Sequence, residues 1–281
     1  MKRRGHVLTV ILGLMIVAAM GCRQEPSEEK RSIEINGSSS LEPAILHWIK
    51  NYPNAAGSSI DWKDTGSNDA IQSLIRGETD VAASSRRMTS RERFRVQELR
   101  VAEATETIVA LGAVAVLVHP SNPVDALDLA ALAKIYSGQA SSWSEFGGKD
   151  AEITIHGRDK SSGTRAFFQK TVLGVRPIAD SMIDHEEHAA IVDAVAADPN
   201  AVGFGPLRRL EGVKVLKVGT ADRAPVGANA ETLKSGAYPL SRSLFLYSRS
   251  DVDSVVREFL SYVISPEGQA ALGPLGLQPA H

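Results

Sequence analysis

The sequence predicts an α/β protein whose sheets are largely parallel. Short segments that alternate polar and apolar side chains recur along the chain, helical patterns follow most of them, and polar turns connect the two. Strands separated by helices are typical of parallel sheets, because a parallel pair needs a long crossover connection. With 281 residues, of which 43% are hydrophobic, the chain is long enough for two hydrophobic cores.

Residues 1–21 are typical of an export signal rather than of a folded element. Basic residues at positions 2–4 precede an apolar run, 7–20, that is too short to span a membrane as an ordinary helix. Small residues come close before Cys22, a pattern that resembles a bacterial lipoprotein signal, in which the cysteine is lipidated and becomes the new N-terminus. The alternatives are an uncleaved anchor and an ordinary secretory signal, and both also export the protein.

Residues 22–31 are polar and lack apolar periodicity, which predicts a flexible tether. Cleavage before Cys22 removes three of the 31 basic residues and leaves 28 against 33 acidic ones, a net charge of −5. A protein that binds nucleic acid normally has a basic excess, so this balance argues against nucleic acid as a partner. The chain has one cysteine, which excludes an internal disulfide. Any anion site must be built locally, from backbone dipoles and one or two arginines.

The first half of the chain repeats one plan of strand, polar turn and helix start. A strand at 32–35 leads through the turn 37–40 into an amphipathic helix at 41–49, for which Ser40 is the expected N-cap. A second strand and a second Gly-Ser turn lead into a short helix that a glycine ends. The further expected elements are strands at 60–64, 80–87 and 107–118, the last with a possible break at Gly112, and helices at 70–77, 90–99 and 127–136.

The most informative stretch follows a predicted strand at 152–155, where a polar loop leads into a helix that begins near Gly163. The first turn of a helix has backbone N–H groups without internal partners and a weakly positive end. Ser162 and Thr164 add hydroxyl groups, and Arg158 adds a fixed cation. This combination suits a tetrahedral oxyanion. The alternative is that Ser162 only caps the helix.

The rest of the chain continues the alternation and contains no further chemical motif. The remaining expected elements are helices at 186–197, 252–264 and 266–272, and strands at 201–205, 213–218 and 243–247. The histidines at 185 and 188 lack the HExxH register and a third ligand, so no metal site is expected. The sequence has no Walker loop, GxGxxG or GxSxG motif, and no cofactor is expected.

Three strand–helix connections are rich in glycine, serine and threonine, at 37–40, 65–68 and 161–164. In open α/β sheets, ligands lie at the carboxyl ends of strands, beside the starts of helices. If these three connections converge, their hydroxyl and amide groups form one cage for an anion.

These segments, in this order, resemble the substrate-binding lipoproteins of bacterial phosphate ABC importers. The resemblance covers residues 32–281 and implies a type II periplasmic binding protein fold, with two α/β lobes of mixed, mostly parallel sheets joined by two hinge strands. It implies that lobe 1 holds residues 32–117 and 240–281, and that lobe 2 holds 118–239. The matching segments are 37–43, 65–67, 80–86, 127–143, 157–164, 201–204, 238–242 and 265–269.

The same resemblance implies a set of phosphate-binding residues. They are Ser39, Ser40, Leu41 through its backbone N–H, Ser67 and Ser85 in the first lobe, and Arg158, Ser162, Gly163 and Thr164 in the second. Ser85 stands where well-studied members have an aspartate, whose carboxylate accepts a hydrogen bond from the protonated oxygen of phosphate and rejects sulfate, which has no proton to donate. A hydroxyl accepts more weakly, which leaves open the selectivity for phosphate over sulfate or arsenate. Other relatives have Ser-Arg here, and Arg86 is therefore expected as a second cation.

The resemblance implies that the protein binds inorganic phosphate outside the cytoplasm, as a monomer anchored to a membrane of the cell envelope, and delivers it to an ABC permease. A surface phosphate sensor without transport would use the same site. An enzyme, either a phosphatase or a serine hydrolase with Ser162 as nucleophile, would need a base within reach, and no Asp–His pairing is suggested by the spacing. A non-enzymatic binding protein is therefore expected.

Overall fold

The computed structural model describes residues 31–53, 58–100 and 102–280. The predicted signal, Cys22 and the tether up to residue 30 lie outside these residues, while Arg31 already belongs to the first strand. The strands are β1 (Arg31–Gly37), β2 (Ser58–Asp64), β3 (Val81–Ser84), β4 (Ala104–Val118), β5 (Ala126–Asp128), β6 (Thr154–Arg158), β7 (Ile183–His185), β8 (Ala201–Pro206), β9 (Lys214–Val215), β10 (Lys217–Thr220), β11 (Arg223–Val226) and β12 (Ser241–Arg249).

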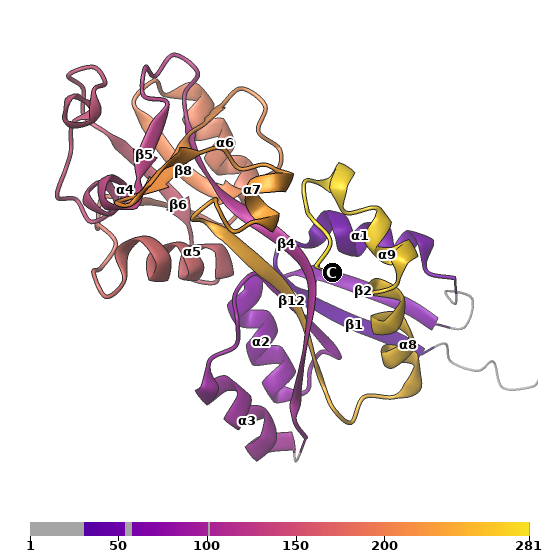
Figure 1. Cartoon of the computed structure of the whole chain (residues 1–281). Coiled ribbons are helices and arrows are strands. Elements are labelled where there is room, and N and C mark those ends of the chain that lie inside the picture. The colour runs from indigo at the N-terminus through magenta and orange to yellow at the C-terminus, as the bar shows by residue number, and fades with distance from the viewer. Residues whose placement is uncertain (1–30, 54–57, 101, 281) are drawn as a thin grey trace, which may run out of the picture. The chain divides into compact units, whose positions relative to one another are not determined.

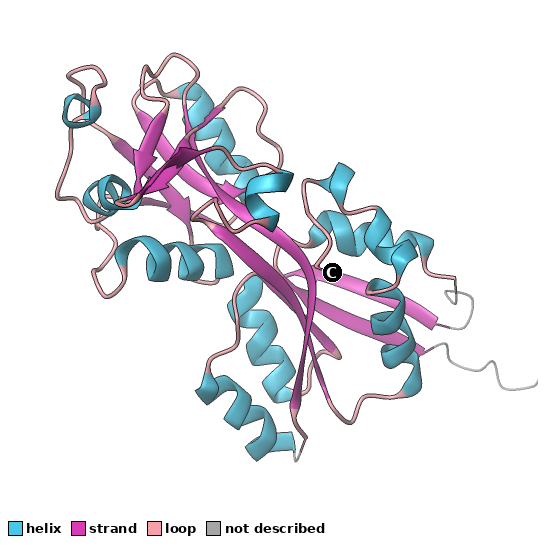
Figure 2. Ribbon diagram, in the orientation of Figure 1, coloured by secondary structure: helices cyan, strands magenta, loops and turns pink. Residues whose placement is uncertain are grey.

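Helices flank the strands on either side (Figure 2). They are α1 (Glu42–Asn51), α2 (Gly66–Arg76), α3 (Ser90–Arg100), α4 (Leu129–Tyr136), α5 (Gly163–Phe168), α6 (His188–Ala197), α7 (Ala230–Lys234), α8 (Ser254–Val263) and α9 (Pro266–Ala270). None of the helices in the described part of the chain has the length and apolar character that crossing a membrane requires. The predicted alternation of strands and helices is confirmed. The sequence analysis did not predict β5, β7, β11 or α7, and the expected strand 213–218 is divided into β9 and β10; most other elements differ only at their ends.

The strands form one mixed sheet in the order β2-β1-β3-β12-β4-β8-β6-β7, with β9 beside β4, and a small sheet in the order β11-β10-β5 (Figure 1). β1 pairs in parallel with β2 and β3, and β6 pairs in parallel with β7 and β8. β12 runs antiparallel to both β3 and β4. We call the part around β1–β3 lobe 1 and the part around β5–β8 lobe 2, joined by β4 and β12.

β4 is a single strand of 15 residues that passes from one lobe to the other. Its first part, up to Ala113, pairs with β12, and its last part, from Val114, pairs with β8. The break that the sequence suggested at Gly112 is absent from this strand. A side chain at Gly112 would lie within 3.2 Å of Leu244, so glycine here permits close packing rather than a turn.

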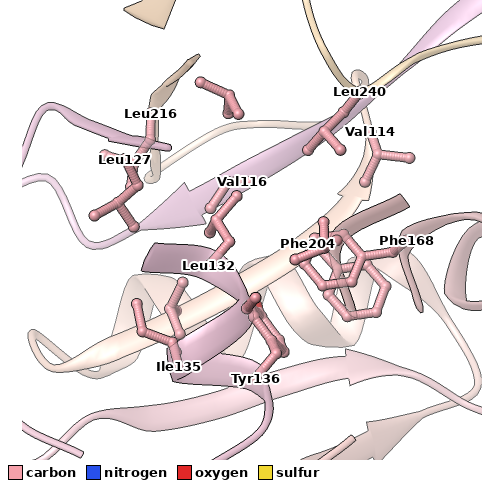
Figure 3. Packing of buried hydrophobic residues seen from close by; sticks show 14 of the residues in the cluster. Val114, Val116, Leu127, Leu132, Ile135, Tyr136, Phe168, Phe204, Leu216 and Leu240 are labelled. Carbon is pink, nitrogen blue, oxygen red and sulfur yellow. The ribbon is translucent and has the colours of Figure 1, made fainter. Parts of the chain in front are cut away.

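Two main hydrophobic clusters lie on the two sides of this connection. The cluster of lobe 1 includes Trp48 and Phe259, and that of lobe 2 includes Tyr136, Phe168 and Phe204, whose rings contact one another (Figure 3). Along β4, cluster membership changes between residues 110 and 113, whereas the lobe boundary expected from the sequence lies after residue 117. Each lobe therefore has its own core, and the segments that leave β1, β3 and β6 lie between the two.

Candidate functional site

The end of β1 approaches the end of β3 closely enough that only glycine fits. A Cβ atom on Gly37 would lie 2.4 Å from the Cβ of Ala83, and the next amide, of Ser38, donates to the carbonyl of Ala83 at 3.0 Å. This contact fixes the turn 38–41 at the carboxyl end of the sheet, which is where a parallel arrangement places ligands.

Ser40 is not the N-cap of α1, although the sequence suggested that it is. The helix begins at Glu42 with Leu41 as its N-cap, and no side chain caps it. The backbone N–H of Leu41, expected to contact ligand, instead donates to the carbonyl of Ser38 at 2.9 Å and closes the turn. Because Ser40 caps nothing, its hydroxyl can point across the cleft, where it lies 3.3 Å from the hydroxyl of Thr164 in lobe 2.

Ser67 and Ser85 lie together against the start of α5. The hydroxyl of Ser67 accepts from the backbone N–H of Ser85 at 3.0 Å and lies 3.2 Å from its hydroxyl. Both residues are fully buried. A Cβ atom on Gly163 would lie 2.3 Å from the Ser67 hydroxyl and 2.7 Å from that of Ser85, so the two lobes touch at this glycine. The convergence predicted for the three polar connections is therefore seen in the structure.

Ser162 caps α5. Its hydroxyl accepts from the backbone N–H groups of Thr164 and Arg165 at 3.2 and 3.3 Å. The structure thus shows the helix cap, but it does not show that capping is the only role of Ser162. The hydroxyl proton is still available for donation. Ser162 and Thr164 are both buried, with 3% and 1% of their surface exposed.

Two arginines enter the cage formed by these hydroxyls. Arg158 lies at the end of β6, because this strand extends three residues beyond its predicted end. It donates to the hydroxyl of Ser39 at 3.0 Å and to the carbonyl of Glu186 at 2.6 Å. Arg242, on β12, donates through Nη2 to the hydroxyls of Ser40 and Thr164, both at 3.0 Å. Arg242 therefore holds one hydroxyl from each lobe.

Neither arginine has an acidic partner among the described residues, and the Nε atom of each has no hydrogen-bond partner there. Burial, and then the charge of Arg158, lower the pKa of Arg242 to about 9, which leaves it protonated at neutral pH. Burial also lowers the pKa of Arg158. The negative charges of Asp159, Asp64 and Glu187 act in the opposite direction and raise this pKa. Buried charges are normally paired, because their desolvation is costly. We therefore regard the cage as a site for an anion.

Arg86, the expected second cation, does not enter the cage. Its guanidinium donates to both carboxylate oxygens of Glu92, at 2.7 and 2.9 Å, and to the side chain of Asn68 at 2.7 Å. Glu92 lies in the first turn of α3 and neutralises this arginine. Arg242, which the sequence analysis did not assign, takes its place. The matching segment 238–242 contains Arg242, but the sequence pattern does not identify its partner across the cleft, and β12 has a second arginine, Arg249.

The histidines near the cage are paired with protein atoms. His156 Nδ1 lies 3.0 Å from His185 Nε2, and Nε2 of His188 lies 2.7 Å from the carbonyl of Arg208. Burial lowers the pKa of His188 to about 4, so that it is neutral and donates this bond. No group of three or more potential metal ligands occurs in the residues that the structure describes.

A family model described as a PBP superfamily domain matches residues 24–267. The phosphate-binding protein PstS of Bacillus subtilis is 28% identical over 290 residues, with 97% of this chain and 92% of the relative covered. PstS of Staphylococcus epidermidis is 27% identical over 291 residues, with 96% and 87% covered.

Solved structures show the same fold. A putative phosphate ABC transporter substrate-binding protein with bound phosphate, from Clostridium perfringens, has a TM-score of 0.81 at 24% identity, covering 89% of this chain and all of that one. An ABC-type phosphate transport receptor from Vibrio cholerae has a TM-score of 0.72 at 25% identity, covering 88% and 99%. These comparisons confirm the resemblance and the fold class expected from the sequence. Because the family model spans most of its length, the chain belongs to the PBP superfamily.

Proposed function

We propose that this protein binds inorganic phosphate between its two lobes, outside the cytoplasm, and delivers it to an ABC import permease. The observation that carries the proposal is the pair of buried arginines, Arg158 and Arg242, which face hydroxyls of both lobes without an acidic partner among the described residues. The printed names of the relatives, phosphate-binding proteins and a phosphate transport receptor, support phosphate as the anion.

Binding requires no covalent step. The hydroxyls of Ser39, Ser40 and Thr164 now accept hydrogen bonds from the two guanidinium groups. A phosphate in the cage provides stronger acceptors for the same donors and leaves the hydroxyl protons free to donate to it. Hydrogen bonds that involve a charge contribute about 1.5–3 kcal/mol each. Several of them, less the cost of closing the lobes, are consistent with about −8 kcal/mol or better, which is micromolar affinity.

The contacts between the lobes explain how binding couples to closure. Ser40 and Ser67 belong to lobe 1, whereas Gly163 and Thr164 belong to lobe 2. A ligand that contacts both sets binds the closed form better than an open one, and it therefore shifts the population toward closure. In our proposal the closed, loaded form is the one that the permease recognises.

Nothing in the geometry favours the enzyme alternative. The hydroxyl of Ser162 is engaged in the cap of α5, and no histidine or carboxylate in the described chain hydrogen bonds to it. A serine nucleophile needs such a base within about 2.6–3.2 Å. A phosphate sensor without transport shares the site, and uptake of phosphate by cells that carry or lack the protein separates the two functions.

The location of the protein is part of the proposal. A lipid on Cys22 would hold the folded chain, as a monomer, at the surface of a membrane of the cell envelope. Incorporation of a radiolabelled fatty acid that is lost in Cys22→Ser tests this anchor. Incorporation that persists in the variant contradicts it.

Calorimetry with inorganic phosphate on residues 23–281 tests the binding function. We expect a dissociation constant in the micromolar range or below, and we expect Arg158→Met to raise it about 10- to 150-fold, because one or more charged hydrogen bonds are lost. The matched control is Arg223→Met on β11, a residue exposed to solvent, which is expected to bind like the wild type. Equal affinity in wild type and Arg158→Met contradicts the assignment of the cage.

A further inference from the structure

A cavity of about 610 Å³ adjoins the cage, between residues 85–89, which follow β3, and the region of α5. We call it the vestibule. Its floor includes Phe167 and Phe245, and its charged lining residues are Arg86, Arg87, Lys170 and Arg242. An inorganic anion in the cage does not need this space for itself. The binding of phosphate in the cage, as described above, therefore does not explain why the vestibule is there.

The vestibule and the cage share two residues, Ser85 and Arg242. The guanidinium of Arg242 lies 5.5 Å from the centre of the Phe167 ring, on which it rests as a cation–π contact. Its Nη1 donates to the carbonyl of Ser85 at 3.2 Å, while its Nη2 holds the hydroxyls of the cage. Arg242 thus contacts both spaces and lies where they adjoin.

Every ionisable side chain that lines the vestibule is basic. Arg86 is neutralised by Glu92, but Arg87 is 64% exposed and contacts Glu106 only at 3.3 Å. Lys170 is exposed, and no acidic side chain of the described chain pairs with it. The chain as a whole carries a net charge of −2. The vestibule is therefore a local region of positive charge on a protein that otherwise repels anions weakly.

Direct bonds close the contact between the lobes at Asn68, which is a lining residue of the vestibule, and at Arg208. Asn68 donates from its backbone to the carbonyl of Ser161 at 3.1 Å and from its side chain to that of Lys160 at 2.7 Å. Arg208 of lobe 2 pairs with Glu42 of lobe 1 at 3.3 Å. Arg87 and Lys170 line the vestibule from lobe 1 and lobe 2, and among the described residues no carboxylate bridges them. The vestibule therefore offers an approaching anion a basic space beside Arg242.

We propose that the vestibule is an outer capture site for hydrated phosphate, from which the ion passes Arg242 into the cage. This inference rests on the proposed function. Lys170 and Arg87 attract the ion before the protein dehydrates it, so their charge accelerates association and does not hold the bound ligand. Electrostatic steering of this kind raises association rates by about 10- to 1,000-fold, and salt screens it over roughly 10 Å at 0.1 M.

Stopped-flow kinetics with inorganic phosphate on residues 23–281 test the proposal. This part of the chain has no cysteine, so a dye on Asp69→Cys, beside the Asn68 contact, reports closure in every variant. We expect Arg87→Gln with Lys170→Gln to lower the association rate constant about 5- to 10-fold at low salt and to leave dissociation unchanged. The difference is expected to shrink at 0.5 M salt.

The matched control neutralises Lys217 and Arg223, two exposed basic residues of the small sheet of lobe 2, and is expected to change neither rate. Association at the wild-type rate in the vestibule variant overturns the capture site. A loss that is equal at all salt concentrations, or a faster dissociation, overturns it as well, because it indicates a structural role. If the wild type itself binds no phosphate, the proposed function fails, and the capture site fails with it.

Discussion

Replacing Gly163 by alanine adds one methyl group at the contact between the lobes. The added carbon would lie 2.3 Å from the hydroxyl of Ser67, 2.6 Å from its Cβ and 2.7 Å from the hydroxyl of Ser85. All three distances are shorter than van der Waals contact allows. The backbone of Gly163 is not in the left-handed region, and it opens a helix in which alanine is favoured over glycine. The substitution is therefore compatible with lobe 2 itself and opposes only the closed arrangement.

The cost of closure follows from this overlap. Ser67 is fully buried and its hydroxyl accepts the N–H of Ser85, so the side chain cannot rotate away without losing that bond. Adding a methyl to a well-packed contact costs about 1–3 kcal/mol. Since phosphate is held by both lobes, the same free energy is lost from binding, and the dissociation constant is expected to rise about 5- to 150-fold.

Calorimetry measures the affinity of Gly163→Ala, and thermal unfolding without ligand measures its stability. We expect weaker binding with an unfolding temperature equal to that of the wild type or slightly higher. The control is Gly227→Ala, where no atom lies within 4 Å of the added carbon and affinity is expected to be unchanged. Wild-type affinity in Gly163→Ala would refute the inference that the lobes meet at this glycine when ligand is bound.

Two other predictions concern selectivity and pH. Ser85→Asp places a carboxylate beside Ser67, and this carboxylate can accept a hydrogen bond from a protonated phosphate but only repels sulfate. Competition titrations should therefore show that sulfate binding is weakened more than phosphate binding. Equal weakening of both contradicts a place for Ser85 at the ligand. Burial lowers the pKa of His188 from 6.5 to about 4, so between these values the unfolded chain binds a proton that the folded chain does not. The free energy of unfolding should therefore fall by about 3 kcal/mol as the pH drops through this range. Denaturant titrations of His188→Gln should lack that part of the decrease. If the variant and the wild type lose the same free energy over this range, the role given to His188 is wrong.

The sequence predicted the fold and the three polar connections because these depend on local patterns. The alternation of strands and helices is repeated many times, and each Gly-Ser turn stands directly before a helix start. Such patterns also predicted that the three connections meet, and the structure has Ser40 beside Thr164 and Ser67 beside Gly163, since the carboxyl ends of strands share one edge of a sheet.

The errors concern partners that are distant in the sequence. Arg242 and Ser40 are 202 positions apart in the sequence, and local patterns cannot predict a contact between residues so far apart. Arg86 is the expected second cation because other relatives have Ser-Arg at this position, but in this chain the carboxylate of Glu92 neutralises it. The sequence also does not show where β4 passes from one lobe to the other, because the strand continues without interruption, with apolar residues on both sides of Gly112.

The central claim is that Arg242 is a buried charge kept for an anion rather than for stability. Thermal unfolding of Arg242→Met on residues 23–281, with and without phosphate, tests it most directly. At 100 times the dissociation constant, phosphate should stabilise the wild type by about 2.7 kcal/mol. The account predicts that the unliganded variant is at least as stable as the wild type, because the desolvated charge that lowers the pKa of Arg242 is gone. It also predicts that the same phosphate concentration raises the unfolding temperature of the variant by much less than that of the wild type. A variant that is strongly destabilised without ligand and is shifted by phosphate as much as the wild type would contradict it.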